Sequence, residues 1–133
     1  MNKDTERRIL QVAMAVACLV PIGGGLAGVV LGQRLTGALA GAGPLDLGLD
    51  SHVRYLSGLL LAIGAGFAMA IPRIEVQGHR VTLLSGIVVL GGLARLYGIA
   101  VAGWPSGVMC AALVMELVIV PLIWLWQRRI ARP

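Results

Sequence analysis

The chain has 133 residues, of which 58% are hydrophobic and only 13% are charged, and its mean hydropathy is +0.89. A soluble domain carries roughly a quarter charged residues, so this composition excludes an ordinary soluble protein and indicates an integral membrane protein. The net charge of +5 does not indicate nucleic-acid binding, because the basic residues are placed like those that flank membrane spans.

Four apolar segments are long enough to cross a bilayer, whose core of ~30 Å needs about 20 helical residues. They take up nearly the whole chain, which predicts one all-α transmembrane domain over residues 1–133. The predicted architecture is polytopic, an antiparallel up-down bundle of four transmembrane helices. These helices are Ile9–Leu31, Val53–Ile71, Val81–Ala102 and Gly107–Trp126.

Basic residues are distributed unequally between the two sides of this bundle. Only Arg34 and Arg54 fall on the side of the first and third loops, and Arg95 lies inside a span. Eight fall at the N-terminus, in the second loop and at the C-terminus: Lys3, Arg7, Arg8, Arg73, Arg80, Arg128, Arg129 and Arg132. This asymmetry predicts that both termini are cytoplasmic and that the basic clusters contact anionic lipids.

The first helix begins with MNKDTERRILQVAMAVAC, which also has features of a lipoprotein signal. Ala15, however, stands where a larger aliphatic residue is usual, and the apolar run continues past Cys18. We therefore expect an uncleaved helix. Cys18 and Cys110 differ in predicted depth by roughly 14 Å, so we expect no disulfide between them.

Small residues recur at every fourth position of the first two helices. Such stripes allow close approach of helices in lipid, and we predict that they pack the two helices of one chain together; contacts between copies of the chain are the alternative. The stripes are Gly24, Gly28 and Gly32, followed by Gly58, Ala62, Gly66 and Ala70.

The first outer connection, residues 32–50, is too long for a tight turn and unusually apolar for a loop. Long connections are often lids or binding loops. We predict an interfacial segment with a short helix around Arg34–Ala42. The alternative is a poorly ordered loop that rests on the membrane surface.

The second helix opens with the polar run DSHVRYLSG. Asp50 or Ser51 is expected to cap the helix. Asp50 and Arg54 stand four residues apart with the acid first, the better order for a helical ion pair. His52 shares a face with Tyr55 and is expected at the outer mouth of the bundle.

Arg95 stands in the middle of the apolar run VVLGGLARLYGIAVAG, where a charge needs a partner inside the protein. Three of the four residues at helical spacing from it are glycines, so we expect it to face other helices. A turn near Trp104–Pro105 places Glu116 at a depth within about 3 Å of Arg95. The sequence thus predicts an Arg95–Glu116 ion pair. Pro121 is expected to free the carbonyl of Leu117, beside Glu116.

These polar residues are expected to gather in the outer half of the membrane or near its centre. They form either a purely structural network or a ligand or proton site. No catalytic residue, cofactor or metal is assigned, because the chain has no phosphate loop and no Cys/His metal spacing. The candidate ligand-binding residues are Asp50, His52, Arg54, Tyr55, Arg95 and Glu116.

The runs DSHVRYLSG, AIPRIE, GGLARL, MELV and WLWQRR resemble the bacterial membrane-protein family named domain of unknown function 4345. The resemblance covers about residues 11–129. It implies four membrane helices and a location in the bacterial inner membrane, and it implies no activity.

The leading expectation is a membrane protein that binds a lipid or an amphipathic small molecule at this polar site. Arg95 and Glu116 would hold the headgroup, His52 and Tyr55 would contact it, and the 32–50 segment would cover it. One alternative is an accessory subunit that packs against partner membrane subunits or copies of itself. Another is an isomerase-like enzyme that uses His52 and Glu116; an exporter with Glu116 as proton carrier is disfavoured, because Arg95 would hold Glu116 ionised.

Overall fold

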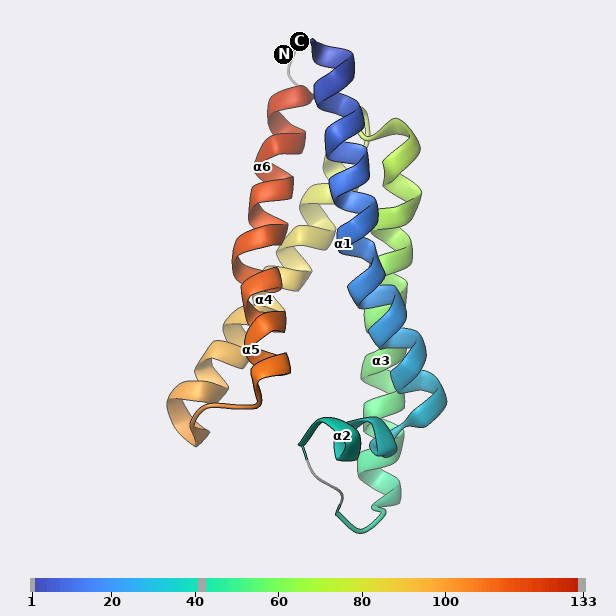
Figure 1. Cartoon of the computed structure of the whole chain (residues 1–133), viewed down its shortest axis with the longest axis vertical. Helices are drawn as coiled ribbons and strands as arrows, with labels where there is room; N and C mark the ends of the chain where they lie inside the picture. The colour runs from blue at the N-terminus through green and yellow to red at the C-terminus, as the bar shows by residue number, and fades with distance from the viewer. Residues whose placement is uncertain (1, 41–42, 132–133) are drawn as a thin grey trace. The chain divides into compact units, whose positions relative to one another are not determined.

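The computed structural model describes residues 2–40 and 43–131, and the regular structure in this part is helical (Figure 1). A 3-10 turn, Ile71–Arg73, follows α3, and a π-helix, Met115–Ile119, joins α5 to α6. The α-helices are α1 Lys3–Leu31, α2 Gln33–Ala40, α3 Leu47–Ala70, α4 Gly78–Ala102, α5 Gly107–Val114 and α6 Val120–Ile130.

Four helical stretches are long and apolar enough to span a membrane, which confirms the predicted all-α multi-pass fold. They are Lys3–Leu31, Leu47–Arg73, Gly78–Ala102 and Gly107–Ile130. The predicted short helix in the first connection is present as α2, Gln33–Ala40. Residues 41 and 42, the last part of that prediction, lie outside the described residues.

The spanning helices extend beyond the predicted bounds. α1 begins at Lys3 and not at Ile9, with Asp4 and Glu6 in its first turn, where acidic residues favour the helix dipole. α4 begins at Gly78 and not at Val81, and the last helix ends at Ile130 and not at Trp126. Hydropathy marks the part of a helix that suits lipid, whereas helical hydrogen bonding continues into the polar flanks.

The start of α3 corrects the predicted cap. α3 begins at Leu47, six residues before Val53, and Asp46 precedes it. The Asp46 Oδ1 atom accepts a hydrogen bond of 2.8 Å from the backbone N of Leu49, as an N-cap does. Asp50 lies in the first turn of α3. Its side chain accepts hydrogen bonds from Gln33 and Arg54 and does not cap the helix.

The chain forms two compact units, and α1 contributes to both. Unit 1 contains residues 1–14 and 70–133, and unit 2 contains residues 15–69. The packing of the two units into one bundle stays a prediction.

In unit 2, α1 and α3 run antiparallel with their backbones in direct contact. A Cβ added at Gly25 would lie 2.6 Å from the backbone N of Leu61, and one added at Gly28 would overlap Ser57. On α3, a Cβ at Gly64 would lie 2.8 Å from Ile22 Cγ1. The small residues therefore pack this helix pair as predicted.

The stripe itself is shifted from the prediction. A Cβ at Gly24 would meet only Leu60, at 3.9 Å, and one at Gly58 would have nothing within 4 Å. The contact face of α1 uses Gly25 and Gly28, three apart, and not a strict four-residue repeat. Both spacings lie on one side of a helix, so spacing alone does not choose between them.

In unit 1, α4 and the last helix form an antiparallel hairpin around the turn at residues 103–106, and the start of α1 packs beside α6 (Figure 1). Gln11 Nε2 donates to the carbonyl of Ile71 at 2.8 Å, and Trp126 Nε1 donates to Glu6 at 3.1 Å. The buried side chains of this unit include Leu10, Met14, Ile74, Val81, Ile123 and the polar Gln127.

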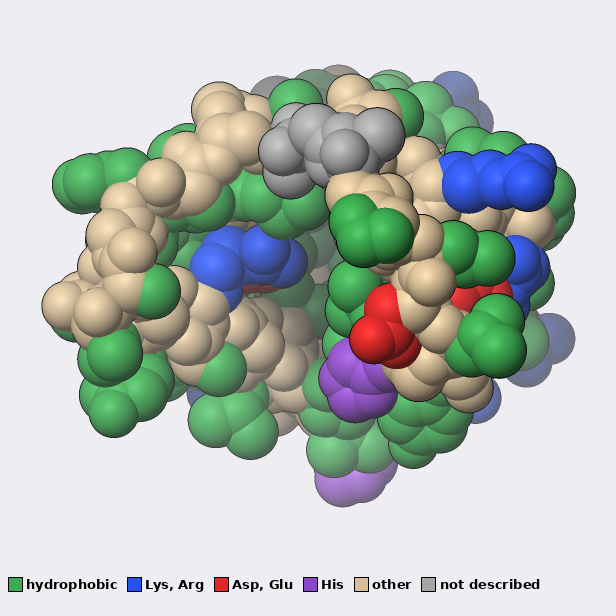
Figure 2. All heavy atoms as spheres, turned by 90° about the horizontal axis from the view of Figure 1, so that it is seen from below, with side chains coloured by type: hydrophobic (Ala, Val, Ile, Leu, Met, Phe, Trp, Pro, Cys, Tyr) green, Lys and Arg blue, Asp and Glu red, His purple; other side chains and the backbone are tan. Residues whose placement is uncertain are grey.

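Large apolar side chains are exposed along every spanning helix, among them Val16, Leu60, Leu90 and Leu122. Such a surface would aggregate in water but suits lipid. Figure 2 shows the molecule from one end, where hydrophobic side chains stand beside several charged ones. Cys18 and Cys110 are both free thiols.

Replacing Gly25 by alanine should destabilise unit 2, because the added methyl group would lie 2.6 Å from the backbone N of Leu61. We expect the free energy of unfolding, measured by SDS titration in mixed micelles, to fall by about 1–3 kcal/mol. Gly23→Ala is the matched control, since nothing lies within 4 Å of a Cβ there. Equal stability of the two variants would contradict this packing.

Candidate functional site

Arg95 on α4 contacts Glu116 through two parallel hydrogen bonds in unit 1. Arg95 Nε lies 3.1 Å from Glu116 Oε2, and Arg95 Nη2 lies 3.1 Å from Glu116 Oε1. This bidentate arrangement matches the planar guanidinium to the planar carboxylate, and it is among the strongest hydrogen-bonding geometries in proteins. The side chains are partly buried, with 35% and 20% of their surface exposed.

Glu116 lies in the π-helix, Met115–Ile119, which ends just before Pro121. The backbone N of Val120 donates to the carbonyl of Met115, five residues earlier. Proline removes a donor and crowds the preceding turn, and the chain here widens into a π-turn. The sequence predicted a loosened carbonyl beside Glu116; the structure has a π-turn that contains Glu116 itself. Such turns occur often at functional sites.

Gly92 brings α4 close enough for this contact. A Cβ at Gly92 would lie 2.7 Å from Leu117 Cδ2 and 3.0 Å from Glu116 Cβ. The glycines at positions 91 and 98, which also flank Arg95 at helical spacing, have nothing within 4 Å of an added Cβ. One of the three neighbouring glycines therefore makes the close approach that the sequence suggested for all of them.

The Arg95 guanidinium keeps part of its hydrogen-bonding capacity. Its Nη1 donates to the Sδ atom of Met109 at 3.3 Å, a weak acceptor. The guanidinium has five N–H groups, and three of them have partners among the described residues. Two N–H groups thus remain for a further acceptor.

Asp50 and Arg54 form a clamp in unit 2. Arg54 Nε donates to Asp50 Oδ2 at 2.8 Å, and Arg54 Nη1 donates to the carbonyls of Val29 and Val30 at 2.6 and 3.1 Å. Asp50 Oδ1 accepts from the backbone N of Gln33 at 2.8 Å. Arg54 therefore satisfies the last carbonyls of α1, and Asp50 satisfies the first amide of α2.

The clamp closes over Gly32, which links the two helices with a φ of +56°. This left-handed conformation is one that glycine adopts without strain. A Cβ at Gly32 would also overlap Asp50 Oδ1. The predicted Asp50–Arg54 pair is thus present, and its partners give it a structural role at the α1–α2 corner.

His52 and Tyr55 are exposed on α3 in unit 2, and Tyr55 is 65% exposed. No hydrogen bond to either side chain is found in the described part of the chain. The gathering of these residues with Arg95 and Glu116, which belong to unit 1, stays a prediction.

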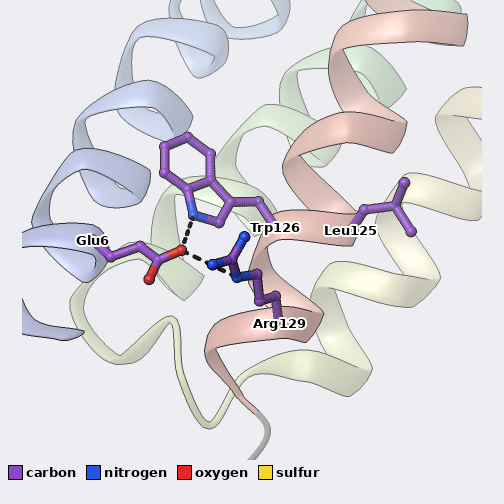
Figure 3. A pocket seen from close by; sticks show the side chains of 4 residues that line it. All are labelled: Glu6, Leu125, Trp126 and Arg129. Carbon is purple, nitrogen blue, oxygen red and sulfur yellow. Dashed lines mark hydrogen bonds and ion pairs between the residues drawn. The ribbon is translucent and has the colours of Figure 1, made fainter. Parts of the chain in front are cut away.

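Unit 1 also contains a polar cluster that the sequence did not predict. It lies where the start of α1 meets the end of α6. Glu6 Oε1 accepts from Trp126 Nε1 at 3.1 Å and lies 3.5 Å from Arg129 Nε. Figure 3 shows these three side chains pointing toward one another beside a cavity of about 440 Å³, which Leu125 also lines.

Further polar contacts continue this cluster. Arg7 Nε lies 3.1 Å from Glu75 Oε2, at ion-pair distance but not aligned for a hydrogen bond. Gln127 is fully buried and donates to the carbonyl of Ile74 at 2.8 Å. The sequence carries a signal for this cluster in the polar runs PRIEVQGHR and WLWQRR, but such runs also flank membrane spans that have no site.

A family model described as Domain of unknown function (DUF4345) matches residues 9–127. This match confirms the resemblance found in the sequence. No curated protein and no solved structure matches the chain.

Replacing Arg54 by glutamine should loosen the α1–α2 corner, because the carbonyls of Val29 and Val30 and one oxygen of Asp50 would lose their donor. We expect hydrogen–deuterium exchange of the amides in residues 29–36 to accelerate on the order of tenfold. Arg34→Gln, an equal charge change at an exposed position of α2, is the control. Unchanged exchange in the Arg54 variant would exclude the clamp.

The Arg95–Glu116 pair should show energetic coupling in a double-mutant cycle. Arg95→Gln and Glu116→Gln each leave one partly buried charge without its partner, whereas the double variant leaves two neutral amides. We expect a coupling energy of about 0.5–3 kcal/mol, measured by SDS titration of the four proteins. Additive losses of stability would show that the two side chains act independently.

Proposed function

We propose that this protein binds a lipid or an amphipathic small molecule at Arg95 and Glu116. The chain belongs to the family described as Domain of unknown function (DUF4345), and that description names no activity. The observation that carries the proposal is the π-turn at Glu116, opposite an arginine with unused donors. π-turns of this kind occur frequently at functional sites.

The chemistry of the pair limits the ligand. Arg95 and Glu116 neutralise each other, so the site offers hydrogen-bond donors without a net charge. It therefore favours a headgroup with an acceptor, such as an ester carbonyl, a hydroxyl or a phosphodiester oxygen. Apolar residues of α4 on either side, such as Leu93 and Leu96, are exposed and would contact the acyl part of the ligand.

The remaining candidates take other places in this proposal. Asp50 and Arg54 already serve the α1–α2 corner, and we leave them out of the ligand contacts. His52 and Tyr55 are exposed on α3 of unit 2, and their contact with a ligand stays a prediction. Neither described cavity is lined by Arg95 or Glu116, so the ligand would lie against the α4–α5 hairpin from the lipid side.

We further propose that the protein lies in the bacterial inner membrane with both termini in the cytoplasm. The support is the excess of lysine and arginine in the terminal segments and the second loop, which follows the positive-inside rule. This orientation would place Arg95 and Glu116 near the centre or in the outer half of the bilayer.

Photo-crosslinking tests the proposed ligand site. The full chain is reconstituted into phosphatidylethanolamine–phosphatidylglycerol vesicles that contain a phospholipid with a diazirine near its headgroup. After illumination, lipid adducts are mapped by peptide mass spectrometry. We expect adducts on α4 and α5 near Arg95 and Met109.

The variant for this test is Arg95→Gln combined with Glu116→Gln, which keeps the net charge and leaves no unpaired charge. We expect it to lose most adducts near position 95, on the order of tenfold, and to keep its fold by circular dichroism. Arg34→Gln, an exposed arginine on α2, should leave the adducts unchanged. Equal labelling of the wild type and the double variant near position 95 would refute the proposal.

A further inference from the structure

A second cavity lies entirely within unit 1, between the start of α4 and the end of α6. Its volume is about 350 Å³. Neither Arg95 nor Glu116 lines this cavity. A ligand bound here would therefore be additional to the one proposed for that pair. The cavity is lined by Gly78, His79, Thr82, Gln127, Arg128 and Ala131.

Gln127 supplies a buried acceptor without a donor. The residue is fully buried, and its Nε2 donates to the carbonyl of Ile74 at 2.8 Å. Turning the amide over would place two acceptors against each other, so Oε1 must be the free atom. This Oε1 has no hydrogen-bond partner among the described residues.

The free Oε1 lies beside the glycine that lines the cavity. A Cβ added at Gly78 would lie 3.6 Å from this oxygen and 3.4 Å from Nε2, so the buried amide lies directly behind the part of the cavity lining that Gly78 forms. A buried carbonyl oxygen without a donor is costly. The cavity therefore suits an occupant that carries an O–H or N–H group.

The same cavity also offers donors to an anion. α4 begins at Gly78, and no side chain caps its first amides, whose N–H groups and dipole attract negative charge. Arg128 lies 5.2 Å from the centre of the Trp124 ring, a cation–π contact that positions its guanidinium. Trp124 is fixed in turn, because its Nε1 donates to Thr82 Oγ1 at 2.9 Å.

We propose that this cavity binds the headgroup of a phospholipid that combines a phosphodiester with a hydrogen-bond donor, such as phosphatidylethanolamine or phosphatidylglycerol. The phosphodiester contacts Arg128 and the first amides of α4, and the headgroup ammonium or hydroxyl donates to Gln127 Oε1. The cavity lies where two spanning helices end, which is the level of the headgroups in a bilayer.

Native mass spectrometry of the full chain in detergent micelles tests this site. The protein is equilibrated with equal amounts of phosphatidylethanolamine, phosphatidylglycerol and phosphatidylcholine that have matched acyl chains. The first two lipids carry a donor in the headgroup, and phosphatidylcholine has none. We expect the first two to be retained in preference to phosphatidylcholine.

Arg128→Gln should reduce this retention on the order of tenfold, because one charge-assisted contact to the phosphodiester is lost. Arg129→Gln is the matched control: it makes the same charge change one residue along, at a side chain that is 79% exposed and outside this cavity. It should leave retention near the wild-type level. Combined Arg95→Gln and Glu116→Gln should also leave it unchanged, which separates this site from the proposed ligand site.

Three results would overturn the proposal. Equal losses in the Arg128 and Arg129 variants would mean that only general charge attracts the lipid. Equal retention of phosphatidylcholine would mean that Gln127 does not select a headgroup that carries a donor. Displacement of the lipid by millimolar inorganic phosphate would mean that the site binds free phosphate and not a lipid.

Discussion

A guanidinium in an apolar helix has no water to bind, so its charge and its donors must be satisfied within the protein or by a ligand. Arg95 meets this constraint through the bidentate contact with Glu116. Two structural features accompany the contact. A side chain at Gly92 would overlap the opposite helix, and the chain at Glu116 takes a π-turn. The ion pair, the close approach at Gly92 and the π-turn before Pro121 therefore occur together at one place in unit 1.

Unit 2 solves the same problem with backbone groups. Arg54 donates to two carbonyls at the end of α1, and Asp50 accepts from the first amide of α2. Helix ends leave such groups without internal partners, and in lipid an unsatisfied backbone group is expensive. The pair therefore allows the chain to turn sharply at Gly32 close to the membrane. Arg54 thus satisfies backbone groups of the neighbouring span, whereas Arg95 pairs with a carboxylate side chain of its neighbour.

The sequence predicted the four spans because hydropathy over about 20 residues is a strong signal. It also led to Glu116 as the carboxylate opposite Arg95, because a short turn relates the depths of two neighbouring helices. It did not predict the π-turn, which depends on how Pro121 and the pair act together, or the cap at Asp46, which lies in an apolar stretch. The polar cluster of unit 1 depends on contacts such as that between Glu6 and Trp126, which are 120 residues apart in the chain. A local sequence pattern cannot predict a contact over such a separation.

Three arginines of this chain differ in how many of their N–H groups the protein itself uses. Arg54 directs all three of its nitrogens to acceptors at the α1–α2 corner, as a structural residue does. Arg95 keeps two N–H groups after binding Glu116 and Met109. Arg128 is positioned by an aromatic ring, which uses its face and leaves its N–H edge available. An arginine that the fold holds in place and that keeps some N–H groups unused is suited to recognise an external acceptor. Of the three arginines compared, Arg95 and Arg128 keep N–H groups that the fold does not use, whereas Arg54 does not.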